Sequence, residues 1–586
     1  MNTPASLGLL ALSLLAAALH ACSGEIEDAP PWTPPAAVVV PGADDFQCET
    51  PRAQDVPLRR LSQRQLTNTV ADVVRRILGP DADAALEELD SALASLVPDQ
   101  RVDAEQDGQL LFFRSDQSIG YGTVEAHLRL GLALGEVLVT PARQDAMGFA
   151  CAIEGATDSA CLDRFVRTLG ALTHRRSLEE SEFGFYRTHA YRAGDDIVLL
   201  DLRDLVVKLF VQPHFLFHVE GLGERSAWEL ASRLSYQFWD SMPDEALMAA
   251  AEDGSLLTPE GWQREVARLV DSERAEDAIR SFILEWFRFD QLFPASSGSG
   301  RDFDAIAGEL PLDASFDRAV EEELVDLFLW NLRNGGSVRD FFLSDVTLTR
   351  DPVLASIYGV APANGEPRAL PPERSSILTR VGMLLARAQI ALPALNSVTH
   401  PILRGAFIRR QITCDDLPDA PAGAMDDLPA VDRTAIGSRA ATEVLTGSSA
   451  CAGCHARINP AGYAFESFDP IGQWRSEERV FNPDGVELPA VALDTSVVSV
   501  EAPDGTTGGA ELAVALWDSG KVGACFARHY LRFLIARAED PSPAGDGCAL
   551  QRLDDAIDDD RPLREVLALS ATAESLRNRT LEGEAQ

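Results

Sequence analysis

Two cysteines and a histidine occupy five positions at the start of the stretch CAGCHARINPAGYAFESFDPIGQWR, which runs from Cys451 to Arg475. Two thiols at a C-x-x-C spacing can reach both vinyl groups of one porphyrin, and a histidine directly after them can ligate the haem iron. Cys451, Cys454 and His455 therefore predict one covalently attached haem c, with His455 as an axial ligand of the iron.

Two other chemistries use the same residue types. A structural zinc site needs a fourth ligand, and no second C-x-x-C or H-x-x-x-H lies nearby in the sequence. A redox dithiol is typical of a βαβ unit, which the flanking stretches TEVLTGSSA and ARINPAGYA do not indicate. Haem attachment is thus favoured over a zinc site, a redox dithiol and a plain disulfide.

The far side of the iron separates an electron carrier from an enzyme. A methionine or histidine closes the site, whereas an open position admits peroxide or oxygen. Met425 and His400 are the nearest upstream candidates for the sixth ligand. The sequence leaves that ligand, and therefore the choice between carrier and haem-dependent oxidoreductase, open.

Aromatic and basic residues around the motif have two possible roles. Arg457 and Arg475 could pair with haem propionates or lie exposed on the surface. The aromatic residues could wall a macrocycle and exclude water, or form the core of a small helical domain. These aromatic residues are Tyr463, Phe465, Phe468 and Trp474.

Acidic residues dominate the charged surface. Asp and Glu number 91 against 51 Lys and Arg, which gives a net charge of -40. Such a charge repels phosphate backbones, so nucleic acid is not expected as a partner.

The N-terminus has the features of an export signal. An apolar run from Leu7 to Leu19 is too short to span a bilayer but has the length of a signal-peptide core. The run ends in Leu19-His20-Ala21-Cys22, which resembles a bacterial lipobox in which Cys22 is lipidated. We therefore expect an exported lipoprotein, anchored to a membrane and facing the periplasm or the cell surface, with an ordinary signal peptide and a stray cysteine as the alternative.

Export places the remaining cysteines in an oxidising compartment, where they pair. Cys151 and Cys161 are close in sequence, as are Cys525 and Cys548, and all four lie at the edges of helical segments. We expect these two pairs, and by elimination a third disulfide between Cys48 and Cys414.

Apolar residues recur at helical spacing along almost the whole chain. The segment DLRDLVVKLFV, for example, places Leu202, Leu205 and Leu209 on one face. Strand patterns are rare, and the best lies between Arg479 and Val500, where VFNPDG supplies turn residues. The expected fold is mainly α, a multi-domain helical assembly with a small late β-hairpin.

Five stretches in fixed order carry a resemblance to a known family. They are PLRRLSQRQLTNTVADVVRRILG, CLDRFVRTLGALTHRRSLEESEF, QPHFLFHVE with ELASRLSYQFWDSMPDEAL, ILTRVGMLLA with THPILRGAFIRRQITC, and the C-x-x-C-H stretch itself. In these motifs the chain resembles the planctomycete-type cytochrome c-like proteins, built from domains of unknown function 1587, 1595, 1592, 1588 and 1585. Asn459 stands where that family usually has Asp.

The N-terminal residues predict a signal peptide over 1–21 and a lipidated Pro-rich tether over 22–56. The resemblance implies the domains that follow, at 57–125, 159–220, 224–352, 371–475 (the cytochrome c-like C-x-x-C-H domain) and 510–578. The family supplies no substrate or redox partner. The expected function is electron transfer by an anchored haem c protein, with a peroxidase-like haem enzyme or a haem-free surface scaffold as alternatives.

Overall fold

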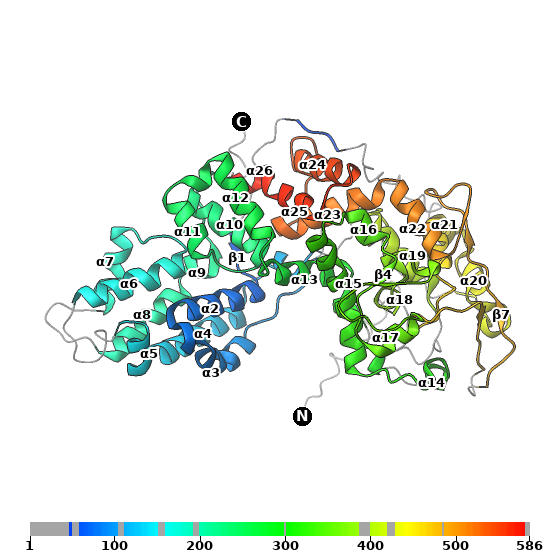
Figure 1. Cartoon of the computed structure of the whole chain (residues 1–586), viewed down its shortest axis with the longest axis horizontal. Coiled ribbons are helices and arrows are strands. Elements are labelled where there is room, and N and C mark those ends of the chain that lie inside the picture. Colours follow the sequence, from blue (N-terminus) through cyan, green and yellow to red (C-terminus); the bar gives the residue numbers. More distant parts are fainter. Residues whose placement is uncertain are drawn as a thin grey trace, which may run out of the picture.

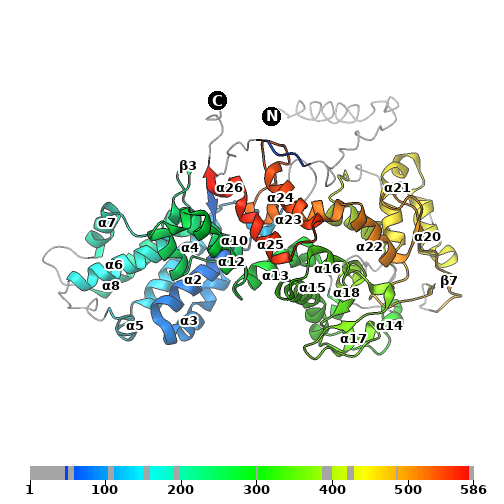
Figure 2. The same ribbon diagram turned by 45° about the horizontal axis from the view of Figure 1, so that its top comes forward.

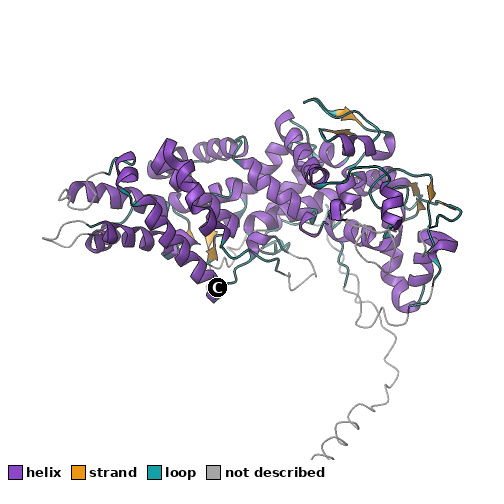
Figure 3. Cartoon of the chain, turned by 90° about the horizontal axis from the view of Figure 1, so that it is seen from below, coloured by secondary structure: helices purple, strands orange, loops and turns teal. Residues whose placement is uncertain are grey.

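The computed structural model describes residues 46–49, 58–102, 111–149, 159–190, 198–292, 294–297, 301–385, 399–418, 428–429, 431–482 and 486–579. This part of the chain is mainly helical, as predicted, and its strands are short antiparallel pairs (Figure 3). None of its helices combines the length and apolar character that crossing a bilayer requires. Cys22, Cys151 and Met425 lie outside the described residues.

The first lobe is a bundle built on its own core (Figure 1, blue to cyan). Its first helix begins at Gln63 because Ser62 and Gln65 form a reciprocal capping box, and it buries Leu66, Val70 and Val73. The helices of this lobe are α2 (Gln63–Leu78), α3 (Ala82–Ala94), α4 (Tyr121–Leu138), α5 (Pro141–Ala146), α6 (Ser159–His174), α7 (Glu180–Ala190), α8 (Leu199–Val211) and α9 (Pro213–Leu216).

The central lobe combines helices that are far apart in the sequence. Phe282 and Trp286 of α13 pack against Phe526 of α23, with ring centroids 5.9 and 5.5 Å away. Figure 2 shows the C-terminal helices lying over α13 and α16 in the middle of the molecule. The segments predicted as separate domains, 224–352 and 510–578, therefore share one core. The helices are α10 (Ala227–Trp239), α11 (Glu245–Glu252), α12 (Pro259–Val270), α13 (Ala275–Trp286), α15 (Ala314–Asn334), α16 (Val338–Phe342), α23 (Lys521–Ile535), α24 (Gly547–Asp558), α25 (Leu563–Leu569) and α26 (Glu574–Arg577).

The third lobe carries the C-x-x-C-H motif and lies at the other end of the molecule from the first (Figure 1). Its helices are α14 (Arg301–Ala307), α17 (Pro352–Ile357), α18 (Val381–Leu385), α19 (Pro401–Phe407), α20 (Arg433–Thr446), α21 (Ser449–Tyr463) and α22 (Gly508–Asp518); one π-helical turn, η10 (Ile408–Ile412), follows α19.

In the described part of the chain, five antiparallel pairs of strands connect these elements. The late hairpin predicted between Arg479 and Val500 is confirmed only in part. β6 (Glu477–Glu478), just before that range, pairs with β7 (Val491–Ala492) inside it. The end of the range contributes β8 (Ser496–Val497), which pairs with β9 (Thr506–Thr507) beyond Val500. The other pairs are β1 (Arg59–Arg60) with β2 (Phe217–His218), β3 (Gly223–Glu224) with β10 (Asn578–Arg579), and β4 (Val346–Thr347) with β5 (Arg368–Ala369).

Candidate haem site

One face of α21 carries all three groups of the motif. Cys451, Cys454 and His455 are spaced by three and four residues, which places neighbouring side chains on the same side of a helix. Both cysteines are free thiols, and all three side chains are half-buried. The two thiols are therefore available for bond formation, which a C-x-x-C disulfide would have prevented.

A directional chain of hydrogen bonds orients the His455 imidazole. Thr446 donates to the carbonyl of Thr442 at 2.7 Å, so its oxygen accepts from Asn459 Nδ2 at 2.9 Å. Asn459 Oδ1 then accepts from His455 Nδ1 at 2.9 Å. Because Nδ1 carries the proton, Nε2 keeps its lone pair, which is the state of a histidine that ligates a metal.

A cavity of about 750 Å³ lies beside His455. Its volume is within the range of roughly 300–1,000 Å³ that is usual for ligand and cofactor pockets. Helices α20 and α21 form one side, and the hairpin of β8 and β9 with the start of α22 forms the other. The lining residues are Arg439, Glu443, Thr446, Ala452, His455, Ala456, Asn459, Pro460, Tyr463, Ser496, Val497, Val498, Asp504, Gly505, Thr506, Thr507 and Glu511.

Arg439 is the basic side chain of that lining. It donates to the backbone oxygens of Asp494 and Ser496 at 2.9 and 2.8 Å, and its guanidinium lies 4.7 Å from the centre of the Tyr463 ring. Burial raises the pKa of the Tyr463 phenol, which therefore stays protonated. Arg439 also pairs with Glu443 at 3.2 Å and with Asp494 at 3.1 Å. The cavity thus joins a paired cation, a neutral phenol and acidic side chains to the His455 imidazole.

The other residues predicted around the motif lie elsewhere. Phe465 and Phe468 are buried in the protein core, whereas Trp474 is 53% exposed, so Tyr463 alone of the four aromatic residues lines the cavity. His400 precedes α19 and is not part of the cavity wall.

The two arginines expected near propionates form ion pairs instead. Arg457 pairs with Asp415 at 3.2 Å, and Arg475 pairs with Glu466 at 3.2 Å. Neither lines the cavity, whereas Arg439, which sequence reasoning did not single out, does. Asn459 was likewise noted only as a departure from the family; its position four residues after His455 places it on the same helix face.

Two glycines allow α19 to cross α21 at close range. A Cβ atom on Gly405 would overlap the carbonyl oxygen of Ile458, and one on Gly462 would overlap that of Pro401. Beside this crossing, buried Arg404 pairs with buried Glu466 at 3.4 Å. Burial lowers the pKa of Arg404 to about 10 and raises that of Glu466, while their mutual attraction opposes both shifts. The crossing sets the position of α21 and therefore of the motif.

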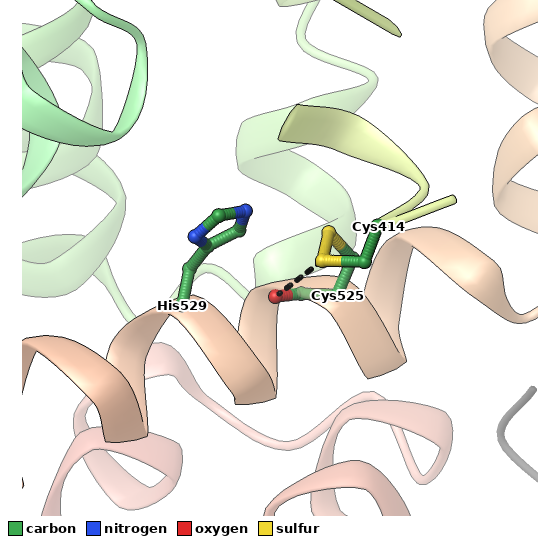
Figure 4. Close-up of side chains that lie close together, drawn as sticks. All are labelled: Cys414, Cys525 and His529. Atoms are coloured by element: carbon green, nitrogen blue, oxygen red, sulfur yellow. Dashed lines mark hydrogen bonds between the residues drawn. A yellow bond between two sulfur atoms is a disulfide. The ribbon is translucent and has the colours of Figure 1, made fainter. Parts of the chain in front are cut away.

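The disulfides differ from the predicted pairing. Cys414 bonds to Cys525, and Cys48 bonds to Cys548, so both the predicted Cys525–Cys548 pair and the predicted Cys48–Cys414 pair are wrong. Cys525 lies on the side of α23 that faces the end of η10, which brings its Cα to 5.3 Å from that of Cys414 (Figure 4). Cys161 is also disulfide-bonded. Proximity in sequence was a poor guide because each partner lies on a different packed segment.

His529 lies one turn after Cys525 on α23, and its ring is close to the disulfide (Figure 4). Since both sulfurs are bonded to each other, this group of three is not a metal site. A second group of three ligating side chains, His174, Glu182 and His214, lies in the first lobe. Neither group contains Cys451, Cys454 or His455. Within the described residues, a zinc ion bound by the C-x-x-C-H motif therefore has no fourth protein ligand among these groups.

Replacing Cys414 and Cys525 together with alanine is expected to lower the free energy of unfolding by about 2–5 kcal/mol, because the bridge closes a long loop between η10 and α23. Urea denaturation followed by circular dichroism measures the change. An unchanged midpoint would show that packing alone holds these two segments together.

Two regions of the chain match known domain families. Residues 226–360 match the family described as protein of unknown function DUF1592, and residues 380–478 match the one described as protein of unknown function DUF1588. No curated protein and no solved structure matched the chain. The two matched regions overlap the segments assigned to these domains from the sequence, and the second contains the C-x-x-C-H motif. Both matches are consistent with the planctomycete cytochrome c-like proteins that the sequence motifs resemble.

Proposed function

We propose that this protein is an exported, lipid-anchored electron-transfer protein with one haem c bound through Cys451, Cys454 and His455. The observation that carries the proposal is the position of His455 on the wall of a cavity of about 750 Å³, with Cys451 and Cys454 within about one turn of it on α21, although neither cysteine lines that cavity. When bound, a haem supplies a one-electron redox couple.

The residues present fit that group. Both cysteines are free thiols, and the Nε2 lone pair of His455 is available because Nδ1 donates to Asn459. Arg439, which lines the cavity and is paired with Glu443 and Asp494, is the guanidinium that would lie nearest a propionate. Cys451 and Cys454 are half-buried, so the two thiols that would hold the haem can be reached from the surface.

The cysteine distribution supports export. The five described cysteines outside the motif are disulfide-bonded, whereas Cys451 and Cys454 are free. Structural disulfides are typical of proteins in oxidising compartments, which is also where haem c is attached. Together with the lipobox-like residues before Cys22, this pattern favours a lipoprotein that faces the periplasm or the cell surface.

The proposal is tested by producing the full chain with haem c maturation machinery and recording its absorbance spectrum. We expect a c-type spectrum that survives acid-acetone extraction, and anchoring that is lost in Cys22→Ala. A colourless protein would contradict haem binding, and a coloured protein whose Cys22→Ala variant fractionates with membranes like the wild type would contradict the lipid anchor alone.

A second candidate function is an oxidative haem enzyme with an open axial position. Among the described residues that line the cavity, His455 is the one imidazole and no methionine is present. A high-spin ferric spectrum and rapid reaction with peroxide would favour the enzyme, whereas a low-spin spectrum inert to peroxide would favour the carrier.

The hydrogen bond from His455 to Asn459 is expected to tune the midpoint potential of the haem. Asn459→Asp supplies a charged hydrogen-bond acceptor, which makes the imidazole a stronger electron donor to the iron, so the midpoint potential should fall. Asn459→Leu removes the acceptor, so the midpoint potential should rise. Spectroelectrochemical titration measures all three proteins. Equal potentials in the two variants would contradict the role of this bond.

A further inference from the structure

A separate cluster of metal-ligating side chains lies in the first lobe. His174 ends α6, Glu182 lies in the first turn of α7, and His214 lies in α9. One ligating atom from each residue lies within 4.8 Å of those of the other two. Helices α6, α7 and α9 are at the opposite end of the molecule from α20 and α21, so this cluster is distinct from the candidate haem site (Figure 1).

The backbone fixes the tautomer of His174. Its Nδ1 lies 3.0 Å from the carbonyl oxygen of Gly170, which can only accept, so Nδ1 carries the proton. Nε2 therefore keeps its lone pair; it lies 4.0 Å from Glu182 Oε1 and 3.4 Å from the Tyr186 hydroxyl. A histidine whose second nitrogen donates to a backbone carbonyl is typical of metal ligands.

His214 is oriented in the same way. Gln212 Oε1 accepts from the backbone N–H of His214 at 2.8 Å and lies 3.1 Å from its Nδ1. The backbone bond identifies Oε1 as the oxygen, so Nδ1 is the donor and Nε2 has the lone pair. The two imidazoles stack with centroids 4.8 Å apart, which brings two neutral ligands side by side.

Glu182 supplies the negative charge. Arg176 donates to both of its carboxylate oxygens, at 2.8 and 2.7 Å, and the backbone N–H of Glu179 donates at 2.9 Å. Arg176 and Glu179 thereby orient the carboxylate. Oε1 accepts one of these bonds and keeps a second lone pair, which can face His174 at 4.0 Å. The hydrogen bonds from Arg176 lower the pKa of Glu182 to about 2, and burial lowers the pKa of His174 to about 4.

We propose that His174, His214 and Glu182 bind one divalent transition-metal ion, through the Nε2 atoms of the histidines and Oε1 of the carboxylate. Two imidazoles and one carboxylate suit zinc or ferrous iron, and water completes the coordination. The ligating atoms must draw closer than the 4.8 Å within which they lie, and the half-buried Glu182 and His214 are the side chains that would move.

Zinc is the probe for this proposal. The tag-free, haem-loaded full chain is stripped with a chelator, equilibrated with zinc chloride and dialysed, and its metals are counted by inductively coupled plasma mass spectrometry. We expect one zinc per chain in addition to the haem iron. X-ray absorption at the zinc edge should show nitrogen and oxygen ligands and no sulfur, because the C-x-x-C thiols are not involved.

Variants distinguish this site from the haem motif. His214→Phe keeps a ring that can stack on His174 but removes the ligating nitrogen. It should weaken zinc binding by at least about 100-fold, which is more than the usual effect of losing a residue that only hydrogen-bonds to a ligand. A protein lacking Cys451 and Cys454 should keep the zinc. Failure of the wild type to retain zinc, equal zinc retention by His214→Phe, or sulfur in the zinc shell would each overturn the proposal.

Discussion

Replacing Cys451 and Cys454 together with alanine is expected to abolish covalent haem attachment. The two thioether bonds are the covalent link to the porphyrin, and within the described residues no other free cysteine remains to replace them. After co-expression with the maturation machinery, in-gel haem staining of the denatured variant should fall to background. His455→Ala, which keeps both thiols, should lose the native spectrum because the axial ligand is removed.

The matched control for this variant also removes two cysteines. Cys48→Ala with Cys548→Ala eliminates the disulfide between the N-terminal segment and α24, far from α21 in the sequence. Its haem stain should equal that of the wild type. If the variant that lacks Cys451 and Cys454 stained for haem as strongly as the wild type, the assignment of these cysteines to haem attachment would be contradicted.

A side chain at Gly405 or Gly462 is expected to disrupt the close crossing of α19 and α21. Gly405→Ala or Gly462→Ala places a methyl group against a backbone carbonyl that cannot move without displacing its helix, and each should lower the free energy of unfolding by about 3 kcal/mol. Urea denaturation measures this change. Haem content should fall in parallel, because the crossing positions α21.

Gly453→Ala is the control for that prediction. Gly453 lies on α21 between the two motif cysteines, and a Cβ there would meet nothing within 4 Å. Alanine is favoured over glycine in a helix, so this variant should be more stable than the wild type by up to about 1 kcal/mol. Loss of stability in all three variants would show that glycine on these helices matters for a reason other than close approach.

Local sequence signals predicted the helical fold and the position of the motif. The apolar stripe that includes Leu202, Leu205 and Leu209 is buried as its spacing predicted. Such features depend on neighbours within one or two turns, which a single sequence contains. The presence of a late antiparallel strand pair was predictable for the same reason, since its turn residues are contiguous, but the pairing of β8 with β9 was not predicted.

The rest depends on contacts between distant segments. The pairing of Cys414 with Cys525 follows from how η10 packs on α23, and no local pattern encodes that packing. The hairpin of β8 and β9 completes the cavity beside His455 although its strands are only two residues long. Arg439 lines the cavity because the kinked α20 packs beside α21, which its sequence alone does not indicate.

Mass spectrometry of the proteolytic peptide that contains Cys451, Cys454 and His455 tests the central proposal most directly. In wild-type protein matured with the haem c machinery, this peptide should carry the full mass of one haem through both cysteines. An unmodified peptide, or one lighter by two hydrogens because the cysteines form a disulfide, would contradict the haem c assignment and favour the haem-free scaffold.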